Sequence, residues 1–563
     1  MARELLTEAL SQAVAAAQRA GELPADLSVE LELQTPRERR HGDFTTSLPM
    51  VIASALNRPP REIADILLRH LDLPADTIET AEVAGPGFVN FTVSLSWLRG
   101  VVRRICQEGE QGYGRADLGQ GRRLLLEFVS ANPTGPVGVV QGRAAAIGDC
   151  LARLLTRVGW QVSREYYVND ALNSTQVQRF AATLEARYLQ QLGRDAEVPE
   201  DGYQGDYVIE MAKELTAEVG DAYASLPPEE RLRVFCEEAL KRIVAGHQRD
   251  MADFGVTFDT WFYESSLYER DAVSDAMDAL RAGGYTYEAD GALWLRATDL
   301  GDDQDHVLIR RDGRPTYLAT DIAYHKDKFD RGFHRLVDIW GPDHHGHVRR
   351  TKAGVRALGY DPDRFEILIH QIVRLFRGSE MVRMSKRAGD IVPLRGLLED
   401  VGRDAARFFF LMQSMDSHLD FDLELAKRQA ADNPVYYVQY AHARICSILR
   451  EAQGRNLLPA GGDPQTPPNA DLDLLGEPDE AALMRKLADL PEEIRQAAER
   501  YEPHRMTRYA RELAATFHGF YTNCRVLGDD PGLTAARLTL VLATRTALRI
   551  VLELAGVSAP EQM

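Results

Sequence analysis

Three histidines and an aspartate occupy five consecutive positions in the segment Trp340-Gly-Pro-Asp-His-His-Gly-His347. The segment follows Arg335–Trp340, a largely apolar run of the length expected for a buried strand. Asp and His bind hydrolytic metal ions, so one interpretation is a metal-dependent phosphoesterase built on Asp343. The further Asp cluster that such a site needs has one candidate, Gly301–Asp305, in a polar turn. The other interpretations are a solvated polar loop, and a loop in which Asp343 or a histidine contacts the ribose or phosphates of a nucleotide.

A second segment, Arg377–Asp390, is basic and punctuated by glycines, which predicts a mobile loop after a strand. Lys and Arg side chains brought onto a polyphosphate stabilise the charge that develops as pyrophosphate leaves. The chain contains 66 Lys and Arg residues, of which eight are Lys and 58 are Arg. Because Arg is the usual cation of this chain, Lys386 stands out. A compact point charge is what a phosphate-binding lysine supplies.

A Gly- and Pro-rich turn, residues 131–136, follows the apolar run Arg123–Ser130 and precedes a helical pattern. In doubly wound sheets, ligands bind at the carboxyl ends of strands, where helix N-termini offer free N–H groups to phosphate. The residues at this point that could contact a ligand are Asn132, Thr134, Gly135 and Gly138. Taken alone, the turn is more typical of a routine loop than of a binding site.

Tyr317 and Asp321 are four residues apart in Tyr317-Leu-Ala-Thr-Asp321. In a helix, this spacing puts the phenol and the carboxylate on one face. A carboxylate beside a hydroxyl is a suitable receptor for a guanidinium or an amine. An isolated pattern of this kind more often marks a helix cap or a solvated salt bridge.

The elements that must position these residues predict a parallel sheet. Arg123–Ser130 has the pattern of a buried strand, residues 142–158 that of a helix, and Gln161–Val168 alternates as a strand. Strand, turn, helix and strand form one βαβ unit, which implies a parallel sheet covered by helices. The pattern returns at Arg335–Trp340 and Phe365–Arg374, each followed by one of the loops described above.

The segments before and after this sheet have a different character. Helical patterns at Arg3–Ala20 and Met50–Leu73, alternation at Ser28–Leu33 and a turn and strand at Ala84–Val93 indicate a small α+β domain. After the sheet, a 3.6-residue period runs almost to the C-terminus and predicts a helical bundle. It is interrupted by the Gly- and Pro-rich linker Gly454–Glu480.

We therefore predict a multidomain α/β fold. At roughly 100–200 residues per domain, 563 residues correspond to about three or four domains. The predicted domains are an N-terminal α+β domain (residues 1–115), a Rossmann-type parallel-sheet catalytic domain (116–395) with a helical insertion (about 170–290), and a C-terminal helical bundle (396–563). With 45% hydrophobic and 27% charged residues, the chain has the composition of a globular protein rather than a disordered one.

The net charge and the cysteines bear on partners and compartment. A formal net charge of −19 argues against a simple basic coat protein for nucleic acid, while a local basic groove is compatible with it. The five cysteines are dispersed and form no Cys-x-x-Cys pair, which indicates a reducing compartment. The N-terminus lacks an apolar signal core, and Leu538–Ala555 is an amphipathic helix rather than a membrane span. We expect a cytoplasmic protein with no membrane contact.

Together, in this order and spacing, the segments resemble the arginyl-tRNA synthetases, a family of class I aminoacyl-tRNA synthetases. The resemblance runs essentially end to end and is carried by Gly301–Asp305, Thr316–Lys328, Ile339–His347, Asp404-Ala-Ala-Arg407 and Gly556–Met563. It implies an N-terminal domain that contacts the tRNA elbow, a class I Rossmann catalytic domain and an anticodon-binding helical domain. The implied reaction activates L-arginine with ATP to arginyl-adenylate, releases pyrophosphate and transfers arginine to tRNA(Arg). The resemblance implies Mg²⁺ as well as ATP, and we expect a monomer.

The resemblance also assigns site residues. Asn132 would hold the backbone groups of arginine, while Tyr317 and Asp321 would bind its guanidinium. Arg383-Met-Ser-Lys-Arg387 matches the family's mobile Lys-Met-Ser-Lys-Ser-type loop, with Ser385 and Lys386 in catalytic roles. The residues implied in ATP binding are Ala131, Asn132, Pro133, Thr134, Gly135, Pro136, Val137, Val139, Val140, Asp343, His344 and Met384. No metal ligand from the protein is implied.

The chain departs from the family at one motif. Class I enzymes have the motif His-x-Gly-His. This chain has Gly138-Val-Val-Gln141 in its place, and we assign Gly138 and Gln141 to the two catalytic positions. Losing one such transition-state donor costs about 2.7–4 kcal/mol, on the order of 10²–10³ in rate, when nothing replaces it. Gln141 can still donate an amide N–H, Gly138 only its backbone N–H, and the candidates for compensation are His344, His345 and His347. We predict an active synthetase that relies more on the Lys386 loop; the alternative is a synthetase-like protein that binds tRNA or senses arginine without charging.

Overall fold

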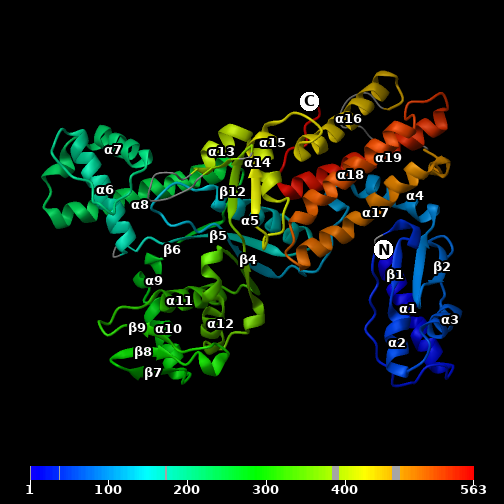
Figure 1. The fold of residues 1–563 in the computed structure, drawn as a ribbon, viewed down its shortest axis with the longest axis horizontal. Helices are drawn as coiled ribbons and strands as arrows, with labels where there is room; N and C mark the ends of the chain where they lie inside the picture. The colour runs from blue at the N-terminus through cyan, green and yellow to red at the C-terminus, as the bar shows by residue number, and fades with distance from the viewer. Residues whose placement is uncertain (1, 37, 172–173, 379, 383–391, 459–469) are drawn as a thin grey trace. The chain divides into compact units, whose positions relative to one another are not determined.

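The computed structural model describes residues 2–36, 38–171, 174–378, 380–382, 392–458 and 470–563 (Figure 1). The chain divides into two compact units. One unit comprises Met1–Tyr113, Ile445–Asp489 and Ala515–Ala547. The other comprises Gly114–Arg444, Leu490–Ala514 and Leu548–Met563. Among the described residues, no helix is both long enough and apolar enough to span a bilayer.

The N-terminal part of the first unit is an α+β structure, as predicted. Its elements are α1 (Ala2–Arg19), β1 (Phe44–Thr46), α2 (Leu48–Leu56), α3 (Pro60–His70), β2 (Ile78–Ala84), β3 (Phe88–Val93) and α4 (Leu95–Gly112). The three strands form an antiparallel sheet in the order β1-β3-β2. The core face of α1 is made of Ala and Leu side chains at helical spacing, and these are buried.

Two predictions for this part are wrong. The helix predicted over Met50–Leu73 is two helices, because Asn57 adopts the left-handed conformation (φ 51°) and ends α2. Pro60, which has no N–H to donate, then opens α3. The alternating segment Ser28–Leu33 is not a strand; pairing there is limited to one bridge, between Gln34 and Thr45.

The C-terminal part of the chain is helical, as predicted. Its helices are α13 (Leu394–Val401), α14 (Arg403–Phe410), α15 (Leu423–Lys427), α16 (Pro434–Gly454), α17 (Pro478–Glu499), α18 (His504–Asn523) and α19 (Pro531–Ala555). In the predicted linker Gly454–Glu480, residues 459–469 lie outside the described residues, and α17 already begins at Pro478.

The second unit contains the predicted parallel sheet. Its strands are β4 (Arg123–Glu127), β5 (Gln161–Val168), β6 (Thr260–Tyr263), β10 (Arg335–Trp340) and β11 (Phe365–Ile369), in the order β11-β10-β4-β5-β6. Helix α5 (Val139–Arg157) connects β4 to β5. Strand β5 therefore lies on one side of β4, and β10, much later in the chain, lies on the other side of β4. In such sheets a ligand crevice opens where the strand order reverses, at the carboxyl ends of β4 and β10.

The strand predicted over Phe365–Arg374 is interrupted. The first part is β11, which ends at Ile369, and the second is β12 (Val373–Arg377), which belongs to another sheet with β13 (Glu380–Val382) and β14 (Leu419–Asp422). The break is held by Arg143, which is fully buried and donates to the carbonyl of Gln371 at 3.0 Å.

The remaining elements of the second unit surround the sheet. They are α6 (Thr175–Gln191), α7 (Asp206–Val219), α8 (Pro228–Asp253), α9 (Ser265–Glu269), α10 (Ala272–Ala282), the antiparallel strands β7 (Thr286–Ala289), β8 (Ala292–Leu295) and β9 (His306–Ile309), and the helices α11 (Tyr317–Asp330) and α12 (Val348–Ala357). Helices α6 to α8 share a core of buried aromatic and aliphatic side chains. Within the span 170–290, the helices α6 to α8 lie between residues 175 and 253, whereas β6 is an edge strand of the parallel sheet.

A buried ion pair joins α5 to the C-terminal helices within this unit. Arg407, 1% exposed, donates to Asp149 on α5 at 2.5 Å and to the carbonyls of Phe254 and Ala555 at 3.3 and 3.2 Å. Asp149 is fully buried and also accepts from Arg153 at 2.9 Å. Burial alone would raise the pKa of Asp149, but Arg407 and Arg153 outweigh it and hold this pKa below its usual value.

We expect Asp149→Asn to lower the free energy of unfolding by about 3–5 kcal/mol, because it leaves the buried Arg407 guanidinium without a counter-ion. The measurement is urea unfolding followed by circular dichroism. Asp278→Asn is the matched control, since Asp278 pairs with Arg281 at the surface and such pairs contribute about 0–1 kcal/mol. Equal shifts for the two variants would contradict the role given to Asp149.

Candidate active site

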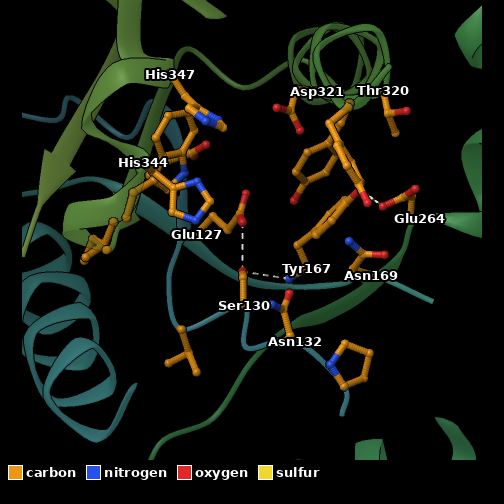
Figure 2. A pocket seen from close by; sticks show the side chains of 18 of the residues that line it. Glu127, Ser130, Asn132, Tyr167, Asn169, Glu264, Thr320, Asp321, His344 and His347 are labelled. Atoms are coloured by element: carbon orange, nitrogen blue, oxygen red, sulfur yellow. Dashed lines mark hydrogen bonds between the residues drawn. The ribbon is translucent and has the colours of Figure 1, made fainter. Parts of the chain in front are cut away.

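A cavity of about 400 Å³ lies at the carboxyl ends of the central strands (Figure 2). It opens at the reversal of strand order, as expected for a doubly wound sheet. The polar and charged residues that line it are Glu127, Ser130, Asn132, Thr134, Tyr167, Asn169, Ser174, Gln176, Glu264, Tyr317, Thr320, Asp321, Tyr324, His325, Asp338, Trp340, His344, His347, Arg350 and His370.

The backbone that leaves β4 is strained where it enters the cavity. Val129 and Ser130 have φ values of 73° and 37°, a region that non-glycine residues rarely adopt and that costs about 1–3 kcal/mol each. Two hydrogen bonds hold this conformation: Ser130 Oγ donates to Glu127 Oε1 at 2.8 Å, and the N–H of Tyr167 donates to Ser130 Oγ at 3.1 Å (Figure 2). The strand end and its neighbour β5 are thereby locked together beneath the ligand space.

The turn 131–136 is anchored by a chain of hydrogen bonds. The N–H of Ala131 donates to the Tyr166 hydroxyl at 3.1 Å, and this hydroxyl is hydrogen-bonded to His247 Nδ1 at 2.9 Å. Because a carbonyl can only accept, His247 Nε2 donates to the Gly135 carbonyl at 2.8 Å. Both ends of the turn are tied to one buried tyrosine–histidine pair.

The turn also contacts the helical segment and leads into α5. Tyr207 on α7 donates to the Thr134 carbonyl at 2.7 Å. Asn132 is exposed and lines the cavity (Figure 2). Gly138 is the N-cap of α5, and Gln141 lies in its first turn. The positive end of a helix dipole and its free N–H groups thus begin directly after the turn.

Helix α11 supplies the opposite wall. Thr316 caps it by accepting from the N–H of Ala319 at 3.4 Å. Tyr317 and Asp321 lie one helical turn apart, as predicted, and both line the cavity, Tyr317 with 65% of its surface exposed. Among the described residues, none donates a hydrogen bond to the Asp321 carboxylate.

Two carboxylates give this end of the cavity an acidic character. Burial raises the pKa of Asp321, partly opposed by His325 and Arg350. Burial also raises the pKa of Glu264, which is 4% exposed, partly opposed by the Tyr167 hydroxyl that donates to it at 2.7 Å. The charge of Asp321 also raises the pKa of Glu264, so a cation near both carboxylates would be stabilised.

Imidazoles and an arginine occupy the other side. Figure 2 shows His344 and His347 across the cavity from Glu264. Burial and Arg350 lower the pKa of His347. Burial lowers the pKa of His370, at the end of β11, to about 4, so this ring is neutral at physiological pH. His347 and His370 therefore favour the neutral form, in which one ring nitrogen can still donate a hydrogen bond.

A buried ion cluster lies beneath the cavity. The Lys328 ammonium donates to Glu127 Oε2 at 2.5 Å and to both oxygens of Asp338 at 2.8 and 2.9 Å. Lys328 and Asp338 have no exposed surface, and Glu127 is 6% exposed. Burial would lower the pKa of Lys328, but the carboxylates Asp338, Glu127 and Glu165 outweigh it and raise this pKa. The lysine is therefore a permanent cation.

The structure brings together part of the predicted site. Of the predicted residues, those lining the cavity are Asn132, Pro133, Thr134, Tyr317, Asp321 and His344. Those described but outside the lining are Ala131, Gly135, Pro136, Val137, Gly138, Val139, Val140, Gln141 and Asp343. Met384, Ser385 and Lys386 lie outside the described residues.

Sequence reasoning missed several lining residues. Glu264 directly follows β6, which had been assigned to a helical insertion. Tyr167 lies near the carboxyl end of the predicted strand Gln161–Val168, and this position is the feature of the sequence that indicates a place at the cavity. His325, which lines the cavity, and Lys328, which lies beneath it, both belong to Thr316–Lys328, one and nearly two helical turns after Asp321.

Comparisons with known proteins agree with this architecture. Three family models match: "Arginyl tRNA synthetase N terminal domain" over residues 3–93, "tRNA synthetases class I (R), catalytic domain" over 102–417 and "DALR anticodon binding domain" over 438–563. The arginine–tRNA ligase of Moorella thermoacetica is 50% identical over 560 residues, covering 99% of this chain and 98% of that protein. The same enzyme of Heliobacterium modesticaldum is 49% identical over 561 residues, covering 100% and 99%.

The fold likeness extends to a solved structure. Thermus thermophilus arginyl-tRNA synthetase superposes with a TM-score of 0.75 at 24% identity, covering 99% of this chain and 100% of that one. These matches exclude the phosphoesterase interpretation of the Asp343 segment, because the identity extends over the whole chain. The chain belongs to the arginyl-tRNA synthetases, the class I ligases that join arginine to tRNA with ATP.

Proposed function

We propose that the cavity is the place where arginine and ATP react, with the arginine guanidinium between Asp321 and Glu264. The observation that carries this assignment is the pair formed by the buried Glu264 and the half-buried Asp321 carboxylates, neither of which forms an ion pair with any described residue. A planar guanidinium with five N–H donors can satisfy both carboxylates at once. Tyr317, the first residue of α11, would cover the side chain of the substrate.

The other end of the substrate would point toward the turn and the histidines. Asn132 and Glu127 both line the cavity. Asn132 would hold the backbone groups of arginine, and the Glu127 carboxylate would accept from the α-amino group. The amino-acid carboxylate would then face His344, His347 and the N-terminus of α5, which favours anions. Arginine is thus oriented by charge, its cationic end toward α11 and its anionic end toward the phosphates.

In the first step the arginine carboxylate attacks the α-phosphorus of ATP and pyrophosphate leaves. In the second, a hydroxyl of the terminal tRNA ribose attacks the adenylate carbonyl and AMP leaves. Gln141, Gly138, Ser385 and Lys386 are the residues we assign to charge stabilisation on the leaving pyrophosphate, from the start of α5 and from the loop 383–387. Since ATP binds Mg²⁺ through its phosphate oxygens, we expect the ion to enter with the nucleotide. The domain limits 1–115, 116–395 and 396–563, the monomeric state and the cytoplasmic location stay predictions.

The deciding experiment is arginine-dependent ATP–pyrophosphate exchange with tRNA(Arg) and Mg²⁺, using citrulline as the matched control. Citrulline replaces the guanidinium with a neutral urea group of nearly the same shape. We expect exchange with arginine and about 10- to 100-fold lower kcat/KM with citrulline, since a hydrogen bond to a charged group contributes about 1.5–3 kcal/mol. Absence of exchange while tRNA binding persists would favour the alternative of a non-charging tRNA-binding protein.

We expect Asp321→Asn to raise the KM for arginine by about 10- to 100-fold and to leave the KM for ATP near its original value. In the unmodified protein the KM for arginine should rise as the pH falls, because the raised pKa of Asp321 lets it bind a proton above the usual range for Asp, near 3.9. Protonation removes the charge that binds guanidinium. The pH dependence of the KM for arginine checks this, and an unchanged acid limb in the variant would contradict the assignment.

Adjacent tyrosines on β5 provide a paired test. Tyr167→Phe removes the donor to Glu264, so we expect a rise of about tenfold in the KM for arginine. Tyr166→Phe leaves the Ala131 N–H and His247 without their partner, so we expect lower kcat and a lower thermal midpoint instead. Steady-state kinetics for both substrates and thermal unfolding separate the two outcomes, and identical profiles would show that neither bond has a specific role.

A further inference from the structure

His325 lies on α11 one turn after Asp321, is 2% exposed and lines the cavity. Both of its ring nitrogens have a partner. Nε2 is 2.9 Å from Asp338 Oδ2, and Nδ1 is 2.6 Å from the main-chain carbonyl oxygen of Asp321. The imidazole therefore bridges strand β10 and the turn of α11 that carries Asp321.

The partners determine the protonation of the ring. Both oxygens of Asp338 accept from the Lys328 ammonium. Burial alone would raise the pKa of Asp338, but Lys328 and His325 outweigh it and lower this pKa, so Asp338 is a carboxylate with no proton to give. The Asp321 carbonyl is also only an acceptor. Each ring nitrogen must then donate, and a ring with two N–H groups is an imidazolium.

The charges around His325 agree with this form. On its own helix it faces the cation Lys328 and the neutral phenol of Tyr324, whose pKa burial raises. The sheet contributes Asp338 from β10, Glu127 from β4 and Glu165 from β5, and β11 contributes the uncharged ring of Phe365, 4.5 Å from the imidazole. Glu165 is paired with Arg331 at 2.6 Å. Arg331 also pairs with Asp327 at 2.8 Å, and burial raises the pKa of Glu127 in spite of Lys328. When the three sheet carboxylates are ionised, an imidazolium at His325 supplies a third cation beside Lys328 and Arg331.

This charge also acts on the carboxylate in the cavity. Asp321 is the fourth carboxylate of the region, and burial disfavours its ionised form. Of the cations that oppose this effect, His325 contributes most, ahead of Arg350, His344 and Lys328. Without the positive charge of the imidazolium, protonation of Asp321 would be favoured. The protonated carboxyl group would attract a guanidinium less strongly.

We propose that His325 is a positioning residue: as an imidazolium donating to the Asp338 carboxylate and the Asp321 carbonyl, it holds the Asp321 turn of α11 toward the cavity and keeps the Asp321 carboxylate ionised for arginine. This role rests on the proposed function, in which Asp321 binds the guanidinium. His325 itself touches no reacting atom. Its effect is therefore confined to arginine binding, and ATP binding is unaffected.

The experiment compares His325→Gln with Lys326→Gln by arginine- and ATP-dependent kinetics from pH 5.5 to 8.5. The glutamine keeps a donor but no charge. Lys326 is the next residue on the same helix and pairs at the surface with Asp330, so its variant controls for a change in α11 alone. For His325→Gln we expect a KM for arginine about tenfold higher, a KM for ATP within about twofold, and an acid limb displaced by about one pH unit toward neutral. The control should match the unmodified protein.

A second measurement does not depend on the variant's activity. In the unmodified protein labelled with ¹⁵N-histidine, the His325 resonance, assigned by its loss in His325→Gln or else in His325→Asn, should show protons on both ring nitrogens at pH 7. A ring with one proton at pH 7, or an unchanged acid limb in a folded His325→Gln protein, would overturn the role of His325. Failure of the unmodified protein to use arginine at all would instead overturn the proposed function.

Discussion

A single buried ammonium holds the catalytic unit together. Lys328 has three N–H donors and makes three hydrogen bonds, one to Glu127 on β4 and two to Asp338 on β10. It thereby fastens α11 to the two strands between which the strand order reverses. Its ammonium also lies 4.3 Å from the centre of the Tyr324 ring. Removing one partner of such a buried pair costs about 3–5 kcal/mol, because the remaining charges stay buried without a counter-ion.

The geometry of the cavity follows from this fastening. Glu127 is held on one oxygen by Lys328 and accepts from Ser130 on the other, so the strained turn after β4 is tied to the same cluster as α11. Asp338 in turn fixes His325 and through it the turn that carries Asp321. The two walls of the cavity, one from the turn and one from the helix, are therefore set relative to each other by one network of charges. A shift in any member would move both walls.

Local patterns were enough to predict the βαβ unit, the helical C-terminal part and the shared helix face of Tyr317 and Asp321, because each depends on periodicity within one segment. One failure is local: Met50–Leu73 has continuous helical hydrophobicity, yet the left-handed Asn57 divides it. The others depend on distant residues. Strand β11 ends early because its continuation pairs with β14, about 50 residues later in the chain. The roles of Glu264 and Lys328 appear only when β6 lies beside β5 and β4 lies beside β10.

The scarcity of lysine was used to single out Lys386, and the same reasoning applies to Lys328 with a different physical cause. In a chain with 58 arginines, Lys328 places a compact ammonium with three donors on two carboxylates, an arrangement that suits a point charge better than a planar guanidinium. The loss of the histidines at 138 and 141 can be understood in similar terms. The turn before α5 is held from outside the motif, by Tyr166, His247 and Tyr207, so its shape does not depend on the residues that begin the helix. The arginine end of the cavity lies on other elements, α11 and the end of β6, so we expect Gly138 and Gln141 to affect the handling of ATP rather than the binding of arginine.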